Sequence, residues 1–126
     1  MAAESRNVKL VCSPFRSTFE FSGNLIFSVS GVAYTQQFFS QLFQSVTIKV
    51  KPFNADYLNT LAEDVREMML KQDTAETQVL NFDLKNNRSR TTQIGDGKVE
   101  IKLMNIGAVE EKGQKVPVFD FSITVL

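Results

Sequence analysis

The chain has 126 residues, 43% of them apolar, and its 14 basic and 14 acidic residues give a formal net charge of zero. This length predicts one domain, over residues 1–126, that can bury a core without help from a metal or a disulfide. The balanced charge excludes an overall field that would steer the molecule toward nucleic acid, a membrane or an acidic substrate, and it is compatible with self-association.

The residue types that the chain lacks restrict its chemistry. It has no histidine, which removes the commonest general base and the commonest metal ligand. Cys12 is the single cysteine, so neither an intrachain disulfide nor an ordinary zinc site can form. We therefore expect a protein that is not an enzyme and that uses no cofactor and no metal.

The start of the chain and its hydropathy predict the compartment. Residues 1–7 are polar and carry charges of both signs, unlike a secretory signal. No apolar run is long enough to cross a membrane. We expect a protein that is not secreted and does not enter membranes, and that lies in the cytoplasm or nucleus, or in a virion or the cytoplasm of an infected cell.

The first predicted elements are three strands. Residues 7–12 form an apolar run, and residues 18–22 and 25–30 alternate between apolar and polar side chains, as half-buried strands do. Gly23 and Asn24, between the second and third strands, favour a two-residue hairpin turn. A single bulged strand through Gly23 is the alternative.

Two helices and a strand are predicted in the middle of the chain. Residues 34–44 predict a short helix because their apolar side chains recur at helical spacing. This stripe consists of Phe38, Phe39, Leu42 and Phe43. Residues 46–51 alternate as a strand, which Pro52 ends. A longer helix is predicted over residues 55–71, with Asn54 as its N-cap.

The C-terminal half predicts an antiparallel β-meander. Its strands are expected over residues 80–85, 89–94, 98–105 and 116–126. A turn at residues 95–97 and a charged loop over residues 107–115 separate the last three strands. The final strand has one apolar face, formed by Phe119, Phe121, Ile123 and Val125.

Together these elements predict an α+β fold. We expect a single antiparallel sheet of about six to seven strands, with both helices packed on one face and the meander as its C-terminal part. The uncovered face of the sheet would be polar.

The first functional interpretation is a protein–protein interaction or assembly subunit that forms a homo-oligomer. The contact would use sheet edges, which can pair with another chain, or an exposed patch of aromatic residues at element boundaries. The aromatic candidates are Phe15, Tyr34 and Phe53. The candidate edges are the final strand and the strand over residues 46–51. The predicted partner-binding residues on these two strands are Val118, Asp120, Ser122, Thr124, Lys49 and Lys51.

The alternative interpretation is a nucleic-acid-binding module. Residues 85–92 are locally basic and polar, and basic side chains of nearby strands would join them in contacts with backbone phosphates. The predicted residues are Lys49, Lys51, Lys85, Arg88, Arg90, Lys98 and Lys102. Acidic residues are interspersed among them, and no pair of outward aromatic residues offers a stacking platform for single strands.

A third interpretation is a carrier of apolar ligands. Its cavity would lie between the helices and the sheet, where two layers of secondary structure face one another.

Overall fold

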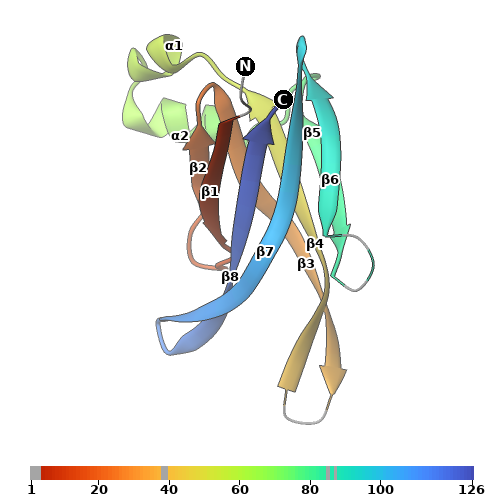
Figure 1. Ribbon diagram of the computed structural model, residues 1–126. Helices are drawn as coiled ribbons and strands as arrows, with labels where there is room; N and C mark the ends of the chain where they lie inside the picture. Colours follow the sequence, from red (N-terminus) through yellow and green to blue (C-terminus); the bar gives the residue numbers. More distant parts are fainter. Residues whose placement is uncertain (1–3, 38–39, 85, 87) are drawn as a thin grey trace.

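The computed structural model describes residues 4–37, 40–84, 86 and 88–126, which form eight strands and two short helices (Figure 1). The strands are β1 (Glu4–Val11), β2 (Phe19–Ser22), β3 (Leu25–Gln37), β4 (Ser40–Pro52), β5 (Gln78–Asp83), β6 (Ser89–Ile94), β7 (Gly97–Glu111) and β8 (Gln114–Val125). The helices are α1 (Ala55–Asn59) and α2 (Glu63–Lys71). No helix in this part of the chain has the length and apolar character needed to cross a membrane.

The chain is mostly β and its strands form two antiparallel four-stranded sheets, so the prediction of an α+β fold with one sheet of six to seven strands is wrong. Sheet I has the order β1–β8–β7–β6, and sheet II has the order β2–β3–β4–β5. Neighbours in each sheet are neighbours in the chain, except that β1 closes against β8. Contacts between β1 and β2 and between β5 and β6 join the sheets along their sides. The architecture is a β-sandwich whose chain runs once around the core.

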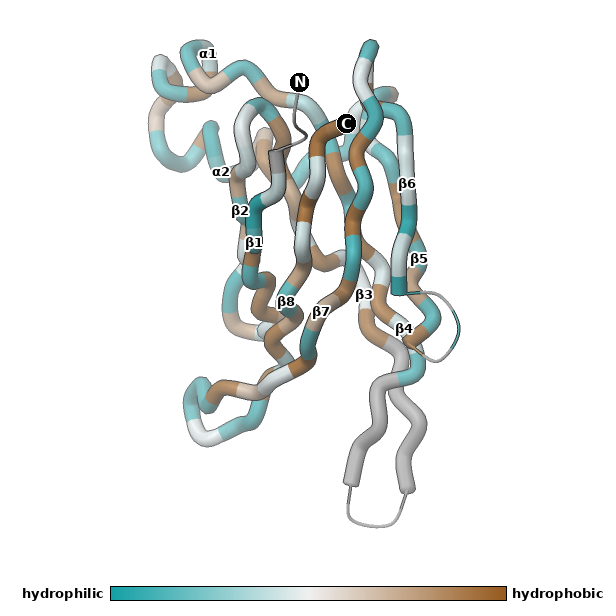
Figure 2. Tube along the Cα trace, in the orientation of Figure 1, coloured by the Kyte–Doolittle hydropathy of each residue, from teal (hydrophilic) through white to brown (hydrophobic). Residues whose placement is uncertain are grey.

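The core lies between the two sheets and contains apolar residues from both. Alternating residues along the strands point into it, and Figure 2 shows the resulting alternation of hydropathy along β7 and β8. The Phe82 ring of sheet II lies 5.6 Å, between ring centroids, from the Phe121 ring of sheet I. Phe119 and Phe121, both fully buried, have centroids 6.3 Å apart. The strand periodicity predicted these inward residues, but it did not indicate that a second sheet would cover them, because alternation is a property of each strand alone.

β8 is a central strand of sheet I. It pairs with β1 on one side and with β7 on the other. The prediction of a strand here is confirmed, and its residues Phe119, Phe121 and Ile123 are buried as expected. Val125, which was expected to face the core, is 42% exposed because it lies at the end of the sandwich.

The helix predicted over residues 34–44 is wrong, since β3 continues to Gln37 and β4 starts at Ser40. Their register places Tyr34 opposite Phe43 and Thr35 opposite Leu42. The ladder that joins β3 and β4 in the sandwich simply continues outward, and this non-local pairing overrides the local helical spacing of a short apolar run.

The long helix predicted over residues 55–71 is divided into α1 and α2. Asn54 is the N-cap as predicted, because its Oδ1 accepts a hydrogen bond from the Tyr57 amide at 3.2 Å. The Arg66 guanidinium donates to the carbonyls of Leu58 and Leu61, at 3.1 and 3.3 Å, where the first helix ends. Leu58 O also accepts from the Leu61 amide at 3.1 Å, so the Arg66 bonds reinforce the end of α1 and stabilise the break. Both helices lie on the outer side of sheet II (Figure 1).

The charged segment over residues 107–115, predicted as a loop, is mostly strand. β7 and β8 continue to a two-residue turn in which Lys112 and Gly113 have φ values of 49° and 79°. Such a turn matches the twist of the flanking strands. The predicted hairpin turns that start at Gly23 and Gly95 are confirmed, with φ values of 60° and 62°.

The first prediction concerns the contact between the sheets. Replacing Phe121 by Ala should lower the free energy of unfolding by about 3–5 kcal/mol, because it leaves a cavity against Phe82 and Phe119. Urea unfolding measures this change. The control is Met104→Ala at a site that is 60% exposed, which should change stability by no more than about 0.5 kcal/mol. Similar effects of the two substitutions would contradict this account of the core.

Candidate functional site

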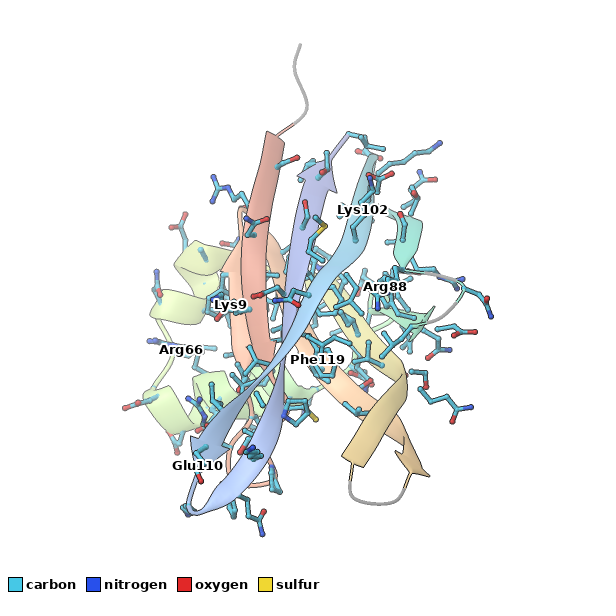
Figure 3. All side chains as sticks on the ribbon, turned by 60° about the horizontal axis from the view of Figure 1, so that its bottom comes forward. Lys9, Arg66, Arg88, Lys102, Glu110 and Phe119 are labelled. Atoms are coloured by element: carbon cyan, nitrogen blue, oxygen red, sulfur yellow. The ribbon has the colours of Figure 1, made fainter. Side chains whose placement is uncertain are left out.

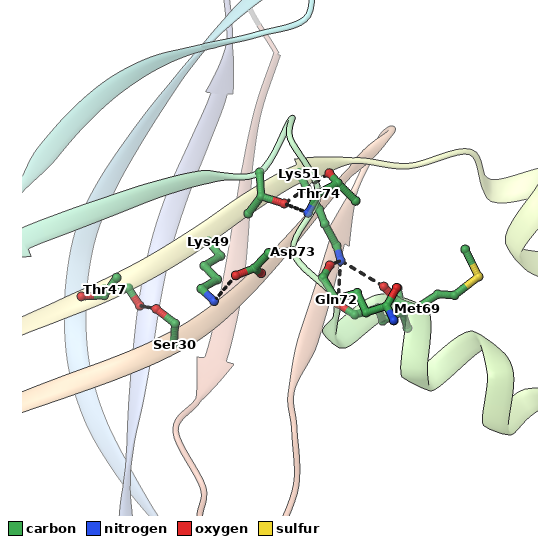
Figure 4. Close-up of polar contacts among 10 residues, drawn as sticks. Ser30, Thr47, Lys49, Lys51, Met69, Gln72, Asp73 and Thr74 are labelled. Atoms are coloured by element: carbon green, nitrogen blue, oxygen red, sulfur yellow. Dashed lines mark hydrogen bonds and ion pairs between the residues drawn. The ribbon is translucent and has the colours of Figure 1, made fainter.

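Lys49 and Lys51 lie on the outer surface of sheet II, on β4. In the register with β3 they stand opposite Ser28 and Ile26. β4 lies between β3 and β5 and is therefore a central strand. The predicted role of Lys49 and Lys51 in partner binding depended on β4 being a sheet edge. Both ammonium groups bind other parts of the same chain (Figure 4).

Lys51 holds the C-terminal end of α2 against the sheet. Its side chain is buried, with an exposed fraction of 8%, and its Nζ donates to the carbonyls of Met69 at 3.1 Å and Leu70 at 2.8 Å, and also to that of Gln72. Terminal helix carbonyls lack partners within the helix and favour a cation. Burial lowers the pKa of Lys51, and the Asp73 carboxylate opposes this shift. Lys51 therefore anchors the helix and does not present its charge to a partner.

Lys49 makes an ion pair with Asp73, whose Oδ2 lies 2.6 Å from its Nζ. Both side chains remain partly exposed, so the pair contributes little to stability. An ammonium group has three N–H donors, so this contact leaves donors of Lys49 for other acceptors.

A pocket of about 270 Å³ surrounds these lysines, which we call the polar pocket. It lies between the outer surface of sheet II, the end of α2 and the segment that joins β1 to β2. Its charged lining residues are Arg16, Lys49, Lys51, Lys71 and Asp73. Its hydroxyl-bearing lining residues are Ser13, Ser17, Thr18, Ser28, Ser30 and Thr77. Basic and hydroxyl groups thus dominate its polar surface.

The segment between β1 and β2 is braced against the end of β7. Arg16 places its Nε and Nη2 atoms 2.9 and 2.8 Å from Glu111 Oε1, and the Ser13 hydroxyl donates to Glu111 Oε2 at 2.5 Å. The hydrogen bond from Ser13 lowers the pKa of Glu111, and Arg16 reinforces this shift. The brace fixes one wall of the polar pocket.

The predicted partner-binding residues of β8 lie on the outer surface of sheet I. Val118, Asp120, Ser122 and Thr124 are partly exposed there. Because β8 is paired on both sides, it has no open edge, and the prediction that this strand lends an edge to a partner is wrong. The hydroxyls of Thr124 and Ser5 are 2.8 Å apart, and Asp120 lies 3.9 Å from Lys9 Nζ.

The residues proposed for nucleic-acid binding do not form one surface. Lys98 and Lys102 are exposed on β7 in sheet I, whereas Lys49 and Lys51 lie on the outside of sheet II. Arg88, seen beside β6 in Figure 3, donates to the Leu84 carbonyl at 2.9 Å. Arg90 stands opposite the buried Ile101, and Lys85 lies outside the described residues.

The predicted aromatic patch is also divided. Phe15 lies under the Lys112 ammonium, 4.8 Å from the ring centroid, near the β7–β8 turn. Phe53 packs on Phe21 at a centroid distance of 5.3 Å, near the β2–β3 turn at the opposite end of the sandwich (Figure 1). The side chain of Tyr34 lies outside the part that the structure describes.

The hairpin of β3 and β4 projects from the end of the sandwich opposite the termini (Figure 1). We call residues 34–43 the β3–β4 arm. The last residue of β4 that pairs with β5 is Ser45, and the register between β3 and β4 shifts at Ala33 and Tyr34, at the base of the arm. Among the described residues, the strands of the arm pair only with each other. No other described strand pairs with either outer edge of this ribbon.

An apolar pocket of about 290 Å³ lies between the sheets, at the end that carries the β2–β3 and β6–β7 turns. Leu25, Ile94, Val99 and Ile123 line it. The sequence analysis expected an apolar cavity between the helices and a sheet. This apolar pocket lies elsewhere, between the two sheets.

Neither the arrangement of possible metal ligands among the described residues nor comparison with known proteins indicates the function. In the part of the chain that the structure describes, no group of three or more Cys, Asp or Glu side chains is arranged to hold a metal ion. No protein-family model, no curated protein and no solved structure matches the chain. The function is therefore inferred from the fold and from the arrangement of its side chains.

Sequence reasoning missed the residues that shape the polar pocket, namely Arg16, Asp73 and Glu111. Each is a charged residue in a segment that looks solvated, and its partner lies far away in the chain. A signal for the arm was present, because the chain has no charged residue between Glu20 and Lys49. Edge strands of soluble monomers usually carry charged side chains that prevent pairing with another chain, so an uncharged segment of this length indicates an unprotected edge.

The second prediction tests the anchor of α2. Lys51→Met keeps the apolar stem but removes the ammonium bonds to the carbonyls of Met69, Leu70 and Gln72, and should lower the free energy of unfolding by about 1–3 kcal/mol. Denaturant unfolding measures the change, with the exposed Lys9→Met on sheet I as the matched control. A stability equal to that of the control would show that Lys51 is not an anchor.

The third prediction is a pH dependence. The pKa of Glu111 is lower in the folded chain than its ordinary value of 4.5. Its contribution to stability is therefore present above that value and is lost as the pH falls through the folded pKa. We expect Glu111→Gln to be less stable than the natural chain at about pH 7, and we expect the difference measured by urea unfolding to shrink as the pH is lowered below 4.5. A difference that does not change with pH would contradict the role of this carboxylate.

Proposed function

We propose that the protein is a non-enzymatic assembly subunit whose β3–β4 arm pairs with a second copy of the chain. The observation that carries this proposal is the ribbon of two strands that extends beyond β5, with outer edges that no strand in the described part of the chain covers. Open edges expose backbone N–H and C=O groups that a further strand can pair with. Two copies can join identical edges about a two-fold axis, which closes the contact.

The sequence of the arm supports an intermolecular role. It contains Tyr34, Leu42 and Phe43, has Phe at positions 38 and 39, and carries no charge. A two-stranded hairpin alone is marginally stable in water and needs a further strand or layer to cover it. Lysine or other charged residues normally prevent pairing at such edges, and this arm has none.

The accessible surface and the net charge are compatible with a partner. The chain exposes 8296 Å², whereas a compact monomer of 14.2 kDa exposes about 6,800 Å². The chain thus exposes more surface than a compact monomer of its mass, as expected when hairpins project from a sandwich (Figure 1). A net charge of zero leaves no overall repulsion between two copies.

The fourth prediction removes the arm while keeping the sandwich. Replacing residues 34–44 by Asn-Gly joins Ala33 to Ser45, which are paired, through a two-residue hairpin turn. Sedimentation over a concentration series should show a dimer for the natural chain and a folded monomer for this variant. A natural chain that remains monomeric at every concentration, or a shortened variant that still dimerises, would contradict the proposal.

Single substitutions test the arm without shortening it. Leu42→Lys and Phe43→Lys should each weaken the dimer at least about tenfold, equivalent to about 1.4 kcal/mol, because a desolvated charge opposes edge pairing. Val109→Lys is the matched control, since Val109 is an exposed apolar residue of the β7–β8 hairpin. The control should dimerise as the natural chain does.

A further inference from the structure

We propose that the polar pocket binds the oxyanion group of a compact ligand, such as the phosphate of a small phosphomonoester. This inference is independent of the arm, because the residues that line the pocket come from the outer surface of sheet II, the end of α2 and the segment between β1 and β2. Three separate parts of the chain line it: the segment between β1 and β2, strands β3 and β4, and the end of α2 with the residues that follow it.

The charge of the pocket favours an anion. Four basic side chains and one carboxylate line it. Lys51 donates its N–H groups to the carbonyls of Met69, Leu70 and Gln72, so it would attract the ligand by its charge without donating a hydrogen bond to it. Arg16 and Lys49 each bind one carboxylate and keep further N–H donors, so they are the residues that would contact the ligand.

A buried hydroxyl without a partner points to the same chemistry. Thr18 Oγ1 is inaccessible to solvent and, within the described residues, has no hydrogen-bond partner. Buried polar atoms of this kind are rare, because an unmade hydrogen bond costs stability. Thr18 lines the pocket together with Ser17 and Ser28. Because Thr18 Oγ1 is closed off in the empty pocket, a rotation of the Thr18 side chain would have to bring its hydroxyl to a bound oxyanion, which Ser17 and Ser28 would contact beside it.

The volume limits the ligand to a compact one. At about 270 Å³ the pocket is slightly below the range of roughly 300–1,000 Å³ that is typical of small-molecule sites. Asp73 and Glu111 already bind Lys49 and Arg16, so a ligand must compete with two carboxylates. A group with two negative charges competes better than one with a single charge, which favours phosphate over carboxylate.

The fifth prediction uses inorganic phosphate as the probe. Amide shifts in ¹H–¹⁵N spectra, titrated at constant ionic strength against chloride, should saturate at Ser17, Thr18, Ser28 and Lys49. Glycerol 3-phosphate should give the same set of shifts if the pocket accepts a phosphomonoester. Shifts that never saturate, or that spread over the exposed lysines of both sheets, would overturn the proposal.

Three variants separate binding from folding. Thr18→Val should reduce phosphate affinity about tenfold without loss of stability, because it removes a hydroxyl that is unpaired in the empty pocket. Lys49→Met should also reduce affinity at least about tenfold. Glu111→Gln should tighten binding, since it releases Arg16 from its carboxylate.

The control for these variants is Lys9→Met, an exposed lysine on sheet I, which should bind phosphate as the natural chain does. Thr18→Val is expected to retain the fold, which circular dichroism checks, so its result stands even if Lys49→Met proves unstable. Unchanged affinity in Thr18→Val and Lys49→Met would overturn the proposal, whatever shifts the natural chain gives.

Discussion

The packing of β8 against the inner face of sheet II is the contact on which the rest of the molecule depends. β8 lies between β1 and β7, and its Phe121 ring meets Phe82 of β5 across the core. Burying large aromatic rings from both sheets supplies much of the hydrophobic free energy that holds two layers together. Because the inner faces of both sheets are buried in this core, ligands and partners can contact only the outer surfaces, the ends of the sandwich or the projecting hairpins.

The two outer surfaces have different roles in the architecture. Sheet I presents a polar surface, with short hydroxyl side chains such as Ser122 and Thr124 beside charged neighbours. Sheet II is partly covered by the two helices, and the buried Lys51 ammonium joins it to the end of α2. This attachment leaves a hollow beside the helix end, which Arg16 and Lys49 line. The polar pocket is thus a consequence of how a short helix is fastened to a sheet.

Elements that depend on neighbouring residues were predicted well, and those that depend on distant residues were not. The hairpin turn at Gly23, the N-cap at Asn54 and the final strand follow from local geometry, and the structure confirms them. The helix expected over residues 34–44 fails because the β3–β4 ladder reaches that segment from the sandwich. The partners of Lys51 and Arg16 could not be predicted, since they lie across the fold and their positions depend on the complete topology.

The sequence by itself determined which side of most strands is apolar, where several two-residue turns lie, and that the 126 residues contain no histidine and cannot form an intrachain disulfide. Only the tertiary structure decided that these strands form two sheets, that β8 is central rather than an edge, and that the β3–β4 hairpin leaves the sandwich as an arm. The physical reason is that periodicity reports the environment of each residue along one strand. Sheet order, open edges and pockets arise from pairing between segments far apart in the chain, which no local pattern records.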